Sequence, residues 1–323
     1  MTPIQRYLAE EVAIDHADGL IPRREALRRL GLLGIGLPAA SALLSACGAP
    51  PELARGTPAT SSGAATPAAS SGAAAPTVSS GPAGTPAASA SAAGPSPLPT
   101  RAITFPGPEG TTLQGAWAAA ADPKGAVLVI HENRGLTDHI RSVAGRLAAS
   151  GYSALAIDLL SREGGTASFA DTAQATAKLG EIAPERFVAD MKAGLGELAK
   201  RANGAKLGMI GFCFGGGMTW LLLSSAEPRL SAAAPFYGPL PDHADFTGTK
   251  AAVLAIYAEQ DNRVNASRDA AKAALEKAGL PHEIVTFPGV NHAFFNDTGP
   301  RYNAQVAAQA YQRVLDWFGE HLS

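Results

Sequence analysis

The sequence predicts an α/β fold over residues 101–323, with a mostly parallel central sheet flanked by helices. Three observations support this prediction. Short apolar runs that fit buried strands alternate with segments of helical spacing. The strand candidates are apolar throughout, as expected of parallel strands that are covered on both faces. The region before residue 101 has a different composition, so the fold is preceded by an N-terminal extension.

The predicted elements alternate along the chain as in an α/β protein. A hairpin over 103–105 and 112–118 opens the region, with turn residues at 106–110. Further strands are predicted at 126–130, 153–157, 207–210, 230–236, 252–257 and 282–287. Helices are predicted at 140–150, 169–179, 184–201, 218–225, 266–278 and 302–321.

Composition and charge exclude several classes of protein. The net charge is −2 and 17% of the residues are charged, so the sequence has no basic footprint for nucleic acid. The two cysteines, Cys47 and Cys213, lie in regions of different composition and imply no disulfide framework. Residues 211–217 lack the spacing of a dinucleotide-binding loop, and His131 and His243 lack partners at metal-ligand spacing. We therefore expect no cofactor and no metal.

Residues 1–47 resemble an export signal. A basic stretch at 23–29 precedes an apolar run at 30–46. The paired arginines at 23–24 resemble a twin-arginine signal, although Ala26 stands where that motif has phenylalanine and Pro22 where it has serine or threonine. An uncleaved transmembrane anchor and an ordinary amphipathic helix are the alternatives.

The end of this segment resembles a bacterial lipobox. Residues 44–47 read Leu-Ser-Ala-Cys, and in such a motif the cysteine is lipidated and becomes the mature N-terminus. The prediction is therefore an exported protein held by lipidated Cys47. It would lie on the outer face of the cytoplasmic membrane or in the periplasm.

Residues 48–100 consist mainly of Ala, Ser, Gly, Pro and Thr. Such a sequence has little apolar surface to offset the entropy of ordering its backbone, so we predict a disordered linker. A glycosylated stalk is the alternative. The predicted organisation is thus a signal at 1–47, a linker at 48–100 and one domain at 101–323.

The stretch 206–217, K-L-G-M-I-G-F-C-F-G-G-G, carries the strongest functional signal. It joins an apolar strand to an apolar helix through Gly211-Phe212-Cys213-Phe214-Gly215, which is the setting of a nucleophile elbow. The flanking glycines permit a strained turn, and the helix N-terminus favours a thiolate at Cys213. On this stretch alone, a buried and inert cysteine is an equal alternative.

Two later strand ends supply the partners of a catalytic triad. Asp261 follows the strand at 252–257, and His292 follows the strand at 282–287. The order nucleophile, acid, histidine is that of an α/β-hydrolase. His292 is expected to hydrogen-bond the thiol of Cys213, and Asp261 to hold the imidazole tautomer.

Residues 101–323 resemble the dienelactone hydrolase family, whose triad has cysteine in place of serine. The matching segments are 211–216, Gln260-Asp261 and Gly289-Val290-Asn291-His292. The resemblance implies an α/β-hydrolase fold and an oxyanion hole made by the backbone N–H groups of Phe214 and Asn133. It also implies that Glu132 accepts a hydrogen bond from the resting thiol, which a carboxylate would protect from oxidation.

One departure from the family concerns the substrate. The founding enzymes place an arginine shortly after the histidine to bind a substrate carboxylate, and residues 293–296 contain no cation. Arg134 and Arg301 are the candidate substitutes, with a solvated loop charge as the alternative for each, and Arg134 is the one assigned to substrate binding. Tyr237, at a strand end, is predicted to line the pocket, although a core aromatic would fit the sequence equally well.

These observations predict an enzyme that hydrolyses an activated carboxylic ester or a lactone through an acyl-enzyme on Cys213. We expect a monomer whose partners are a small-molecule substrate and the membrane, with no nucleic acid. A broad carboxylesterase is the alternative within this class. A ligand-binding or redox-sensing thiol protein is the alternative outside it.

Overall fold

The computed structural model describes residues 1–47 and 93–323. Its centre is one sheet of eight strands: β1 (Arg101–Pro106), β2 (Thr112–Ala118), β3 (Gly125–Ile130), β4 (Tyr152–Asp158), β5 (Leu207–Phe212), β6 (Leu230–Phe236), β7 (Ala252–Ala258) and β8 (His282–Phe287). The strand order is β1-β2-β4-β3-β5-β6-β7-β8. Strand β2 runs antiparallel to both β1 and β4, and all other neighbours are parallel. The predicted α/β fold is therefore confirmed.

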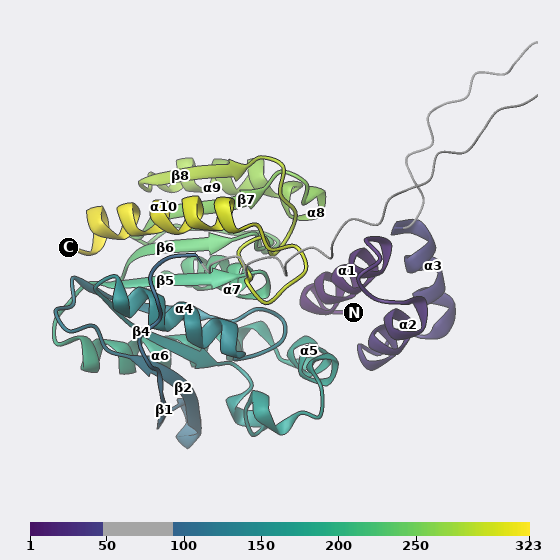
Figure 1. Cartoon of the computed structure of the whole chain (residues 1–323), viewed down its shortest axis with the longest axis horizontal. Coiled ribbons are helices and arrows are strands. Elements are labelled where there is room, and N and C mark those ends of the chain that lie inside the picture. Colours follow the sequence, from purple (N-terminus) through teal and green to yellow (C-terminus); the bar gives the residue numbers. More distant parts are fainter. Residues whose placement is uncertain (48–92) are drawn as a thin grey trace, which may run out of the picture.

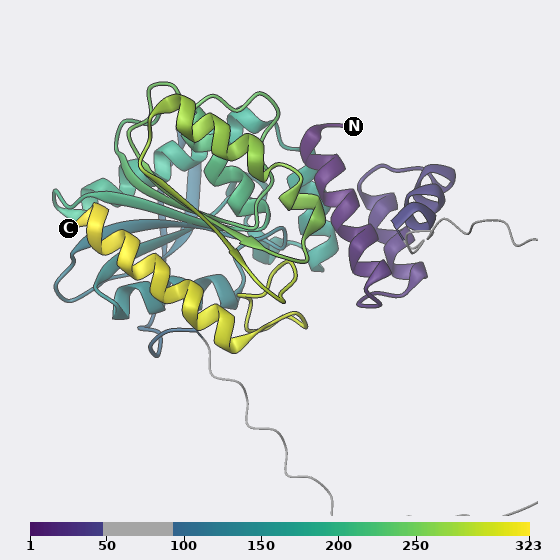
Figure 2. The same ribbon diagram turned by 90° about the horizontal axis from the view of Figure 1, so that it is seen from above.

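Helices cover both faces of this sheet (Figure 1 and Figure 2). They are α4 (Asp138–Ala149), α5 (Thr172–Glu181), α6 (Pro184–Ala202), α7 (Phe214–Ser224), α8 (Asn262–Asn265), α9 (Arg268–Ala278) and α10 (Ala304–Leu322). Helices α4 and α10 lie on one face, and α6, α7 and α9 lie on the other. Because both faces are covered, every residue of β3, β4, β5 and β7 is buried.

Helix boundaries differ from the prediction where polar caps decide them. Helix α5 begins at Thr172 because the Asp171 side chain accepts a hydrogen bond from the Gln174 N–H. Asn303 starts α10 in the same way. The short helix α8 was not predicted, and the side chain of Asp261 caps it.

The N-terminal segment folds into three helices, α1 (Pro3–Ala17), α2 (Arg23–Leu32) and α3 (Leu37–Cys47). The apolar run predicted as one stretch is broken between α2 and α3, where Gly34 has a φ of 79°. Across the described ranges, 1–47 and 93–323, no helix has both the length and the apolar character that a membrane crossing requires.

The predicted linker lies largely outside the described residues, and its last part packs on the domain. Residues 93–100 are described, and the Ala93 carbonyl accepts a hydrogen bond from buried Arg146 at 2.8 Å. The Leu98 N–H donates to the Gly145 carbonyl at 3.0 Å. The packed part of the domain thus begins before the predicted boundary at residue 101.

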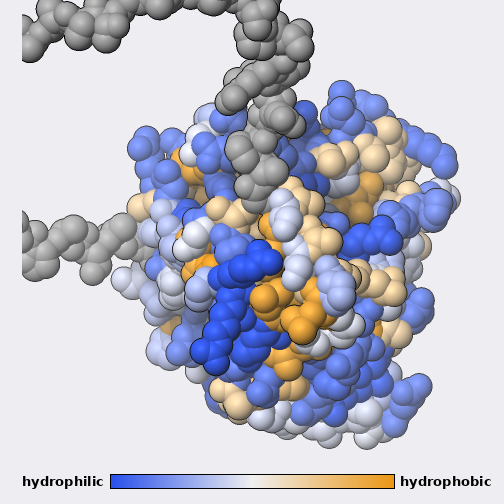
Figure 3. Space-filling model, turned by 90° about the vertical axis from the view of Figure 1, so that its right-hand side faces the viewer, coloured by the Kyte–Doolittle hydropathy of each residue, from blue (hydrophilic) through white to orange (hydrophobic). Residues whose placement is uncertain are grey.

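Helices α1–α3 lie beyond the carboxyl ends of the parallel strands, beside α5 (Figure 1 and Figure 2). Their buried positions include Leu8, Ala13, Ala26 and Leu30, none of which has any exposed surface. Figure 3 views the molecule from this side, where hydrophobic side chains break a mostly hydrophilic surface. The segment therefore covers the edge of the sheet at which an α/β protein places its functional loops.

Candidate active site

The turn between β5 and α7 has the geometry of a nucleophile elbow. Cys213 has φ 57° and ψ −118°, a conformation that side-chain-bearing residues rarely adopt. A Cβ on Gly211 would lie 2.1 Å from the Gly215 carbonyl oxygen, and one on Gly215 would lie 2.5 Å from the Ile130 carbonyl oxygen. Only glycine fits at either place, so the spacing seen in the sequence is required by backbone contact.

The loops after β7 and β8 bring Asp261 and His292 together. The Nδ1 atom of His292 lies 2.5 Å from an Asp261 carboxylate oxygen. The Sγ atom of Cys213 and a ring nitrogen of His292 lie within 4.8 Å of each other. Because Nδ1 is engaged by Asp261, Nε2 is the nitrogen that faces the thiol. The three side chains are buried, with residue exposures of 3%, 4% and 2% in chain order.

Asp261 has two structural partners. One carboxylate oxygen accepts the Val264 N–H at the start of α8 at 3.2 Å, while the other faces His292. Burial opposes ionisation of this carboxyl group, but the neighbouring imidazole and its hydrogen bond outweigh burial and lower the pKa of Asp261. Helix α8 therefore fixes an ionised carboxylate against the histidine.

His131 holds the loop that follows β3. Its Nδ1 lies 2.6 Å from the Glu132 carbonyl oxygen, and its Nε2 accepts the Leu159 N–H at 3.1 Å. The proton is therefore assigned to Nδ1, and burial lowers the pKa of this neutral imidazole. The Asn133 carbonyl accepts the Thr176 hydroxyl at 2.7 Å. These bonds fix the peptides that carry Glu132 and Asn133 beside the elbow.

A family model for the dienelactone hydrolase family matches residues 113–322. The chain belongs to the dienelactone hydrolase family. It is 34% identical over 212 residues to the "Putative carboxymethylenebutenolidase" of Escherichia coli (strain K12), covering 62% of this chain and 78% of that protein. A protein of the same name from Methylorubrum extorquens is 32% identical over 224 residues, covering 64% and 75%.

A solved structure agrees with this assignment. The crystal structure titled "Putative Dienelactone Hydrolase" from Klebsiella pneumoniae subsp. pneumoniae superposes with a TM-score of 0.60 at 28% sequence identity. The match covers 69% of this chain and all of that chain. A domain of this extent thus folds without a counterpart of α1–α3, and the family makes this chain a hydrolase of esters or lactones.

Glu132 lies in the hydrolase site but pairs with a residue other than the thiol. One carboxylate oxygen accepts the Asn296 side-chain amide at 2.5 Å, and the side chain is buried. Its other oxygen has no hydrogen-bond partner among the described residues. The contact between Glu132 and the resting thiol, which the family resemblance implied, is not among the hydrogen bonds of this structure.

Tyr237 packs against the histidine of the site. The residue is fully buried, and its ring packs edge-on against the His292 ring with centroids 5.0 Å apart. The predicted contact of Tyr237 with substrate stays a prediction, and the residue has no exposed surface in this closed arrangement. The Tyr237 ring restricts the orientation of the His292 imidazole. This position agrees with the alternative given in the sequence analysis, a core aromatic.

The thiol's hydrogen-bond partner comes from helix α1, which the sequence analysis did not connect with the site. The Tyr7 hydroxyl lies 3.2 Å from the Sγ atom of Cys213, a contact between residues 206 positions apart. Glu11 Oε1 lies 3.4 Å from Nε2 of His292, and its other oxygen contacts Arg263. The Arg263 guanidinium also stacks over the Tyr7 ring, 4.2 Å from its centroid.

The docked helix changes the electrostatics of His292. Burial disfavours the charged imidazole, but the carboxylates of Glu11 and Asp261, together with Cys213, outweigh it and raise the pKa of His292 well above its ordinary value. Glu11, Cys213 and His292 also place three possible metal-ligating atoms within 4.8 Å of one another. The Arg263 guanidinium on Glu11 opposes a cation there, and this grouping exists only while α1 is docked.

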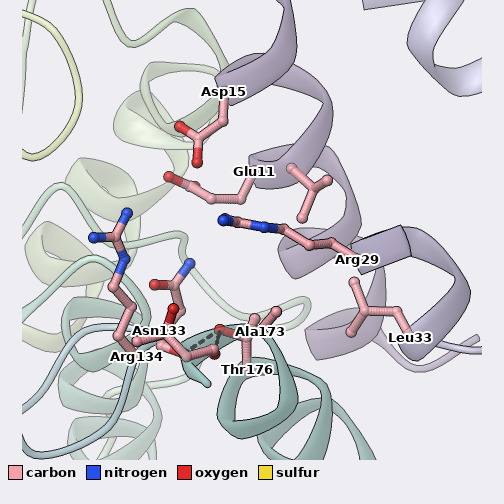
Figure 4. Close-up of a pocket in the computed structure, with 10 residues that line it drawn as sticks. Glu11, Asp15, Arg29, Leu33, Asn133, Arg134, Ala173 and Thr176 are labelled. Atoms are coloured by element: carbon pink, nitrogen blue, oxygen red, sulfur yellow. Dashed lines mark hydrogen bonds between the residues drawn. The ribbon is translucent and has the colours of Figure 1, made fainter. Parts of the chain in front are cut away.

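A cavity of about 250 Å³ reaches Cys213 and His292 from the side of α1 and α2. Three arginines line it: Arg29 from α2, Arg134 from the loop after β3, and Arg301 from the loop before α10. Figure 4 shows Arg29 and Arg134 pointing toward the carboxylates of α1. Arg301 is held by Asp15 at 2.9 Å and by Asp18 at 2.7 Å. Arg134 is exposed and forms no ion pair within residues 1–47 and 93–323.

A second cavity, of about 510 Å³, lies along the N-terminal half of α1 and is mainly apolar. Ile4 and Tyr7 of α1 line it together with Phe214, Met218 and Leu221 of α7. Helix α1 is therefore a wall of both cavities. Cys213 lines the first cavity, and the next residue, Phe214, lines the second.

Proposed function

We propose that this hydrolase cleaves an activated carboxylic ester or a lactone through an acyl-enzyme on Cys213. The observation that carries the proposal is the 2.5 Å contact between Asp261 and His292 beside a strained cysteine elbow. Three loops that are distant in sequence converge on this one arrangement. An inert buried cysteine would need neither the strained conformation nor an oriented histidine.

The reaction begins with attack of the Cys213 sulfur on the carbonyl carbon, while Nε2 of His292 takes the thiol proton. The backbone N–H groups of Phe214 and Asn133 receive the developing oxyanion, and the first of these belongs to the free N-terminus of α7. The carbon–oxygen bond then breaks, and His292 gives its proton to the leaving oxygen. The product of this half-reaction is a thioester.

Water completes the turnover. His292 accepts a proton from the water as it attacks the thioester carbonyl. The carbon–sulfur bond breaks, the acid is released and the proton returns to the thiolate. A thiolate leaves more readily than an ordinary alkoxide, so the first step is productive only when the ester is activated. Enol esters and strained lactones meet this condition.

The export signal and the lipid at Cys47 belong to the same proposal. The support for them is the basic stretch, the apolar run and the lipobox in the sequence. Cys47 is the last residue of α3, so processing before it would remove all but the final residue of the three-helix segment. The hydrolase would then act outside the cytoplasmic membrane.

The test uses the full chain with a protease site inserted between Ser70 and Ser71, in the linker. Both the intact protein and the cleaved, separated domain are assayed with an aryl acetate and an enol lactone. Brief exposure to the aryl ester is expected to add one acyl mass to the peptide that contains Cys213. Cys213→Ala is expected to lose activity by a factor of about 10⁴ or more. The comparison uses whichever of the two forms, intact or cleaved, is more active. If Cys213→Ala in that form keeps more than a few per cent of the wild-type activity, the elbow has only a structural role.

A further inference from the structure

We infer that helix α1 is an intramolecular inhibitor that occupies the substrate's place in the active site. The inference rests on the proposed function, because it takes Cys213 and His292 as the reacting groups. Two side chains of α1 contact those groups directly: Tyr7 at the sulfur and Glu11 at Nε2 of the histidine. Nothing in the proposed chemistry requires either side chain.

The positions of these two side chains conflict with catalysis. An ester carbonyl carbon must approach to about 3–3.5 Å from the sulfur, and the leaving oxygen must come within hydrogen-bond reach of the histidine. The Tyr7 hydroxyl at 3.2 Å and the Glu11 oxygen at 3.4 Å lie at those approach distances. Glu11 thereby presents a carboxylate, the group that hydrolysis produces, to the histidine. The docked helix and a bound ester therefore cannot occupy the space beside the sulfur and the histidine at the same time.

Ion pairs hold α1 in this position. Glu11 pairs with Arg263, whose side chain is only 14% exposed, and Asp15 and Asp18 pair with Arg301, whose side chain is 13% exposed. Acidic residues of α1 and of its C-cap thus meet one arginine on α8 and one in the loop before α10. Buried pairs of this kind fix one geometry, because a change in position leaves a charge without its partner.

Apolar packing between α1, α2 and α5 supports the same docking. A Cβ on Gly180 of α5 would lie 3.2 Å from Leu33 and 3.4 Å from Leu8, so the glycine lets the segment approach closely. The segment 1–47 is too short to bury a stable core by itself. Its helices therefore depend on the domain for stability, and the covalent connection makes their docking an intramolecular event.

Release of α1 would change the site in two ways. The cavities of about 250 and 510 Å³ would both lose the wall that α1 provides, which opens the space beside Cys213. Arg301 would lose Asp15 and Asp18 and become available beside Arg134 for a carboxylate of the substrate. Proteolysis in the linker, or the predicted processing before Cys47, would make this release permanent. The inhibited form would then be the precursor.

The experiment compares the intact chain with the chain cleaved at the inserted site and separated from its N-terminal piece. Two rates are measured: hydrolysis of the aryl acetate, and alkylation of Cys213 by iodoacetamide followed by mass spectrometry. We expect both rates to rise at least tenfold on release. Gly180→Leu, which inserts a side chain between α5 and the segment, should raise both rates in the uncleaved chain. The matched control is Gly31→Leu, because a Cβ there has no neighbour within 4 Å, and it should change neither rate.

The outcomes separate this inference from the proposed function. If release leaves both rates unchanged, α1 does not block the site and the inference fails, while hydrolysis itself stands. If release lowers the rate of hydrolysis, α1 contributes to substrate binding instead of blocking it, and the inference also fails. If release speeds alkylation but neither form hydrolyses any ester, the blocking role of α1 is supported and the proposed hydrolysis is not. The cleaved chain has a wild-type domain, so a misfolded Gly180→Leu variant does not affect this comparison.

Discussion

The Tyr7 hydroxyl lies 3.2 Å from the Sγ atom of Cys213, so the first helix of the chain covers the proposed nucleophile of a domain whose first strand begins only at Arg101. A sulfur in this position is protected from bulky reagents and oxidants as long as the helix stays in place. The covering ring is itself fixed by Arg263, which stacks on it and pairs with Glu11. Four residues thus form one connected cluster across the interface.

Tyr7→Ala should uncover the sulfur without removing the ion pairs of α1. We expect Cys213 in the intact chain to alkylate at least about fivefold faster, since the thiolate must be accessible to react. Ile4→Ala is the control, because Ile4 lies on the same helix and lines the apolar cavity without contacting the sulfur. Equal alkylation rates for the two variants would show that Tyr7 does not cover the thiol.

The docked state should depend on pH through His292. Burial opposes the charged imidazole, and Glu11 is the largest contribution that raises its pKa and the one that leaves with α1, so the docked state binds the proton more tightly than the undocked one. Docking is then fully favoured below the pKa that His292 has in the undocked domain and weakens as the pH rises through the higher docked value. Asp15, whose pKa is raised mainly by burial and by Glu11, contributes in the same direction.

The measurement for this dependence is the ratio of hydrolysis by the intact chain to hydrolysis by the separated domain across pH. The ratio should rise toward alkaline pH, because the helix leaves more often there. In Glu11→Gln the rise should be smaller and begin at lower pH. A ratio that falls with pH would contradict this sign.

Glycine at the elbow should be essential for folding. In Gly211→Ala the new Cβ would lie 2.1 Å from the backbone oxygen of Gly215, which cannot move without disturbing the elbow. We expect a loss of about 3 kcal/mol or more, which corresponds to a Tm lower by roughly 6–12 °C. Gly31→Ala is the control and should be neutral or slightly stabilising, since its Cβ meets no neighbour in a helix. Thermal unfolding of the two variants followed by circular dichroism tests this.

The convergence of Cys213, Asp261 and His292 was predictable because each follows a strand of a parallel sheet, and parallel strands end at one edge. Helix α8 escaped prediction because its four residues carry no periodic pattern, although its cap is the same Asp261 that holds the histidine. Position along the chain does not tell which way the side chain of Tyr237 turns, because this residue directly follows β6 and has a positive φ of 34°.

The docking of α1 could not be predicted from sequence. Its contacts with Cys213 and His292 join residues far apart in the chain, and no local pattern records them. The paired arginines and the lipobox also suggested an export role that accounts for the segment without any contact to the domain. The structure adds the contact and leaves the export prediction as it stood.

Glu132 should still influence the thiol, although Asn296 is its hydrogen-bond partner. Both Glu132 and Cys213 line the polar cavity, and a buried carboxylate there opposes formation of the thiolate. In the separated domain that carries Glu132→Gln, we expect Cys213 to react faster with iodoacetamide and to be oxidised sooner by peroxide. Asn296→Asp is a matched control of opposite sign, because it adds a negative charge beside the same cavity and should slow alkylation. Equal rates for both variants and the wild type would exclude an electrostatic role for Glu132.

Arg134 should set the preference of the released enzyme for a substrate that carries a carboxylate. It is exposed and lines the cavity that contains Cys213 and His292, next to the proposed oxyanion donor Asn133. A charge-assisted pair with a substrate carboxylate contributes roughly 1.5–3 kcal/mol, or about a tenfold to hundredfold preference in kcat/KM. The measurement is one lactone with a free carboxylate against its methyl ester, using the separated domain. Arg134→Gln should abolish most of the preference and leave the methyl ester unaffected, whereas Arg141→Gln, on α4 and away from this cavity, should keep it. If the wild type favours the neutral ester, or if Arg134→Gln keeps the ratio, the pocket is selective for apolar esters and Arg134 is a solvated loop charge.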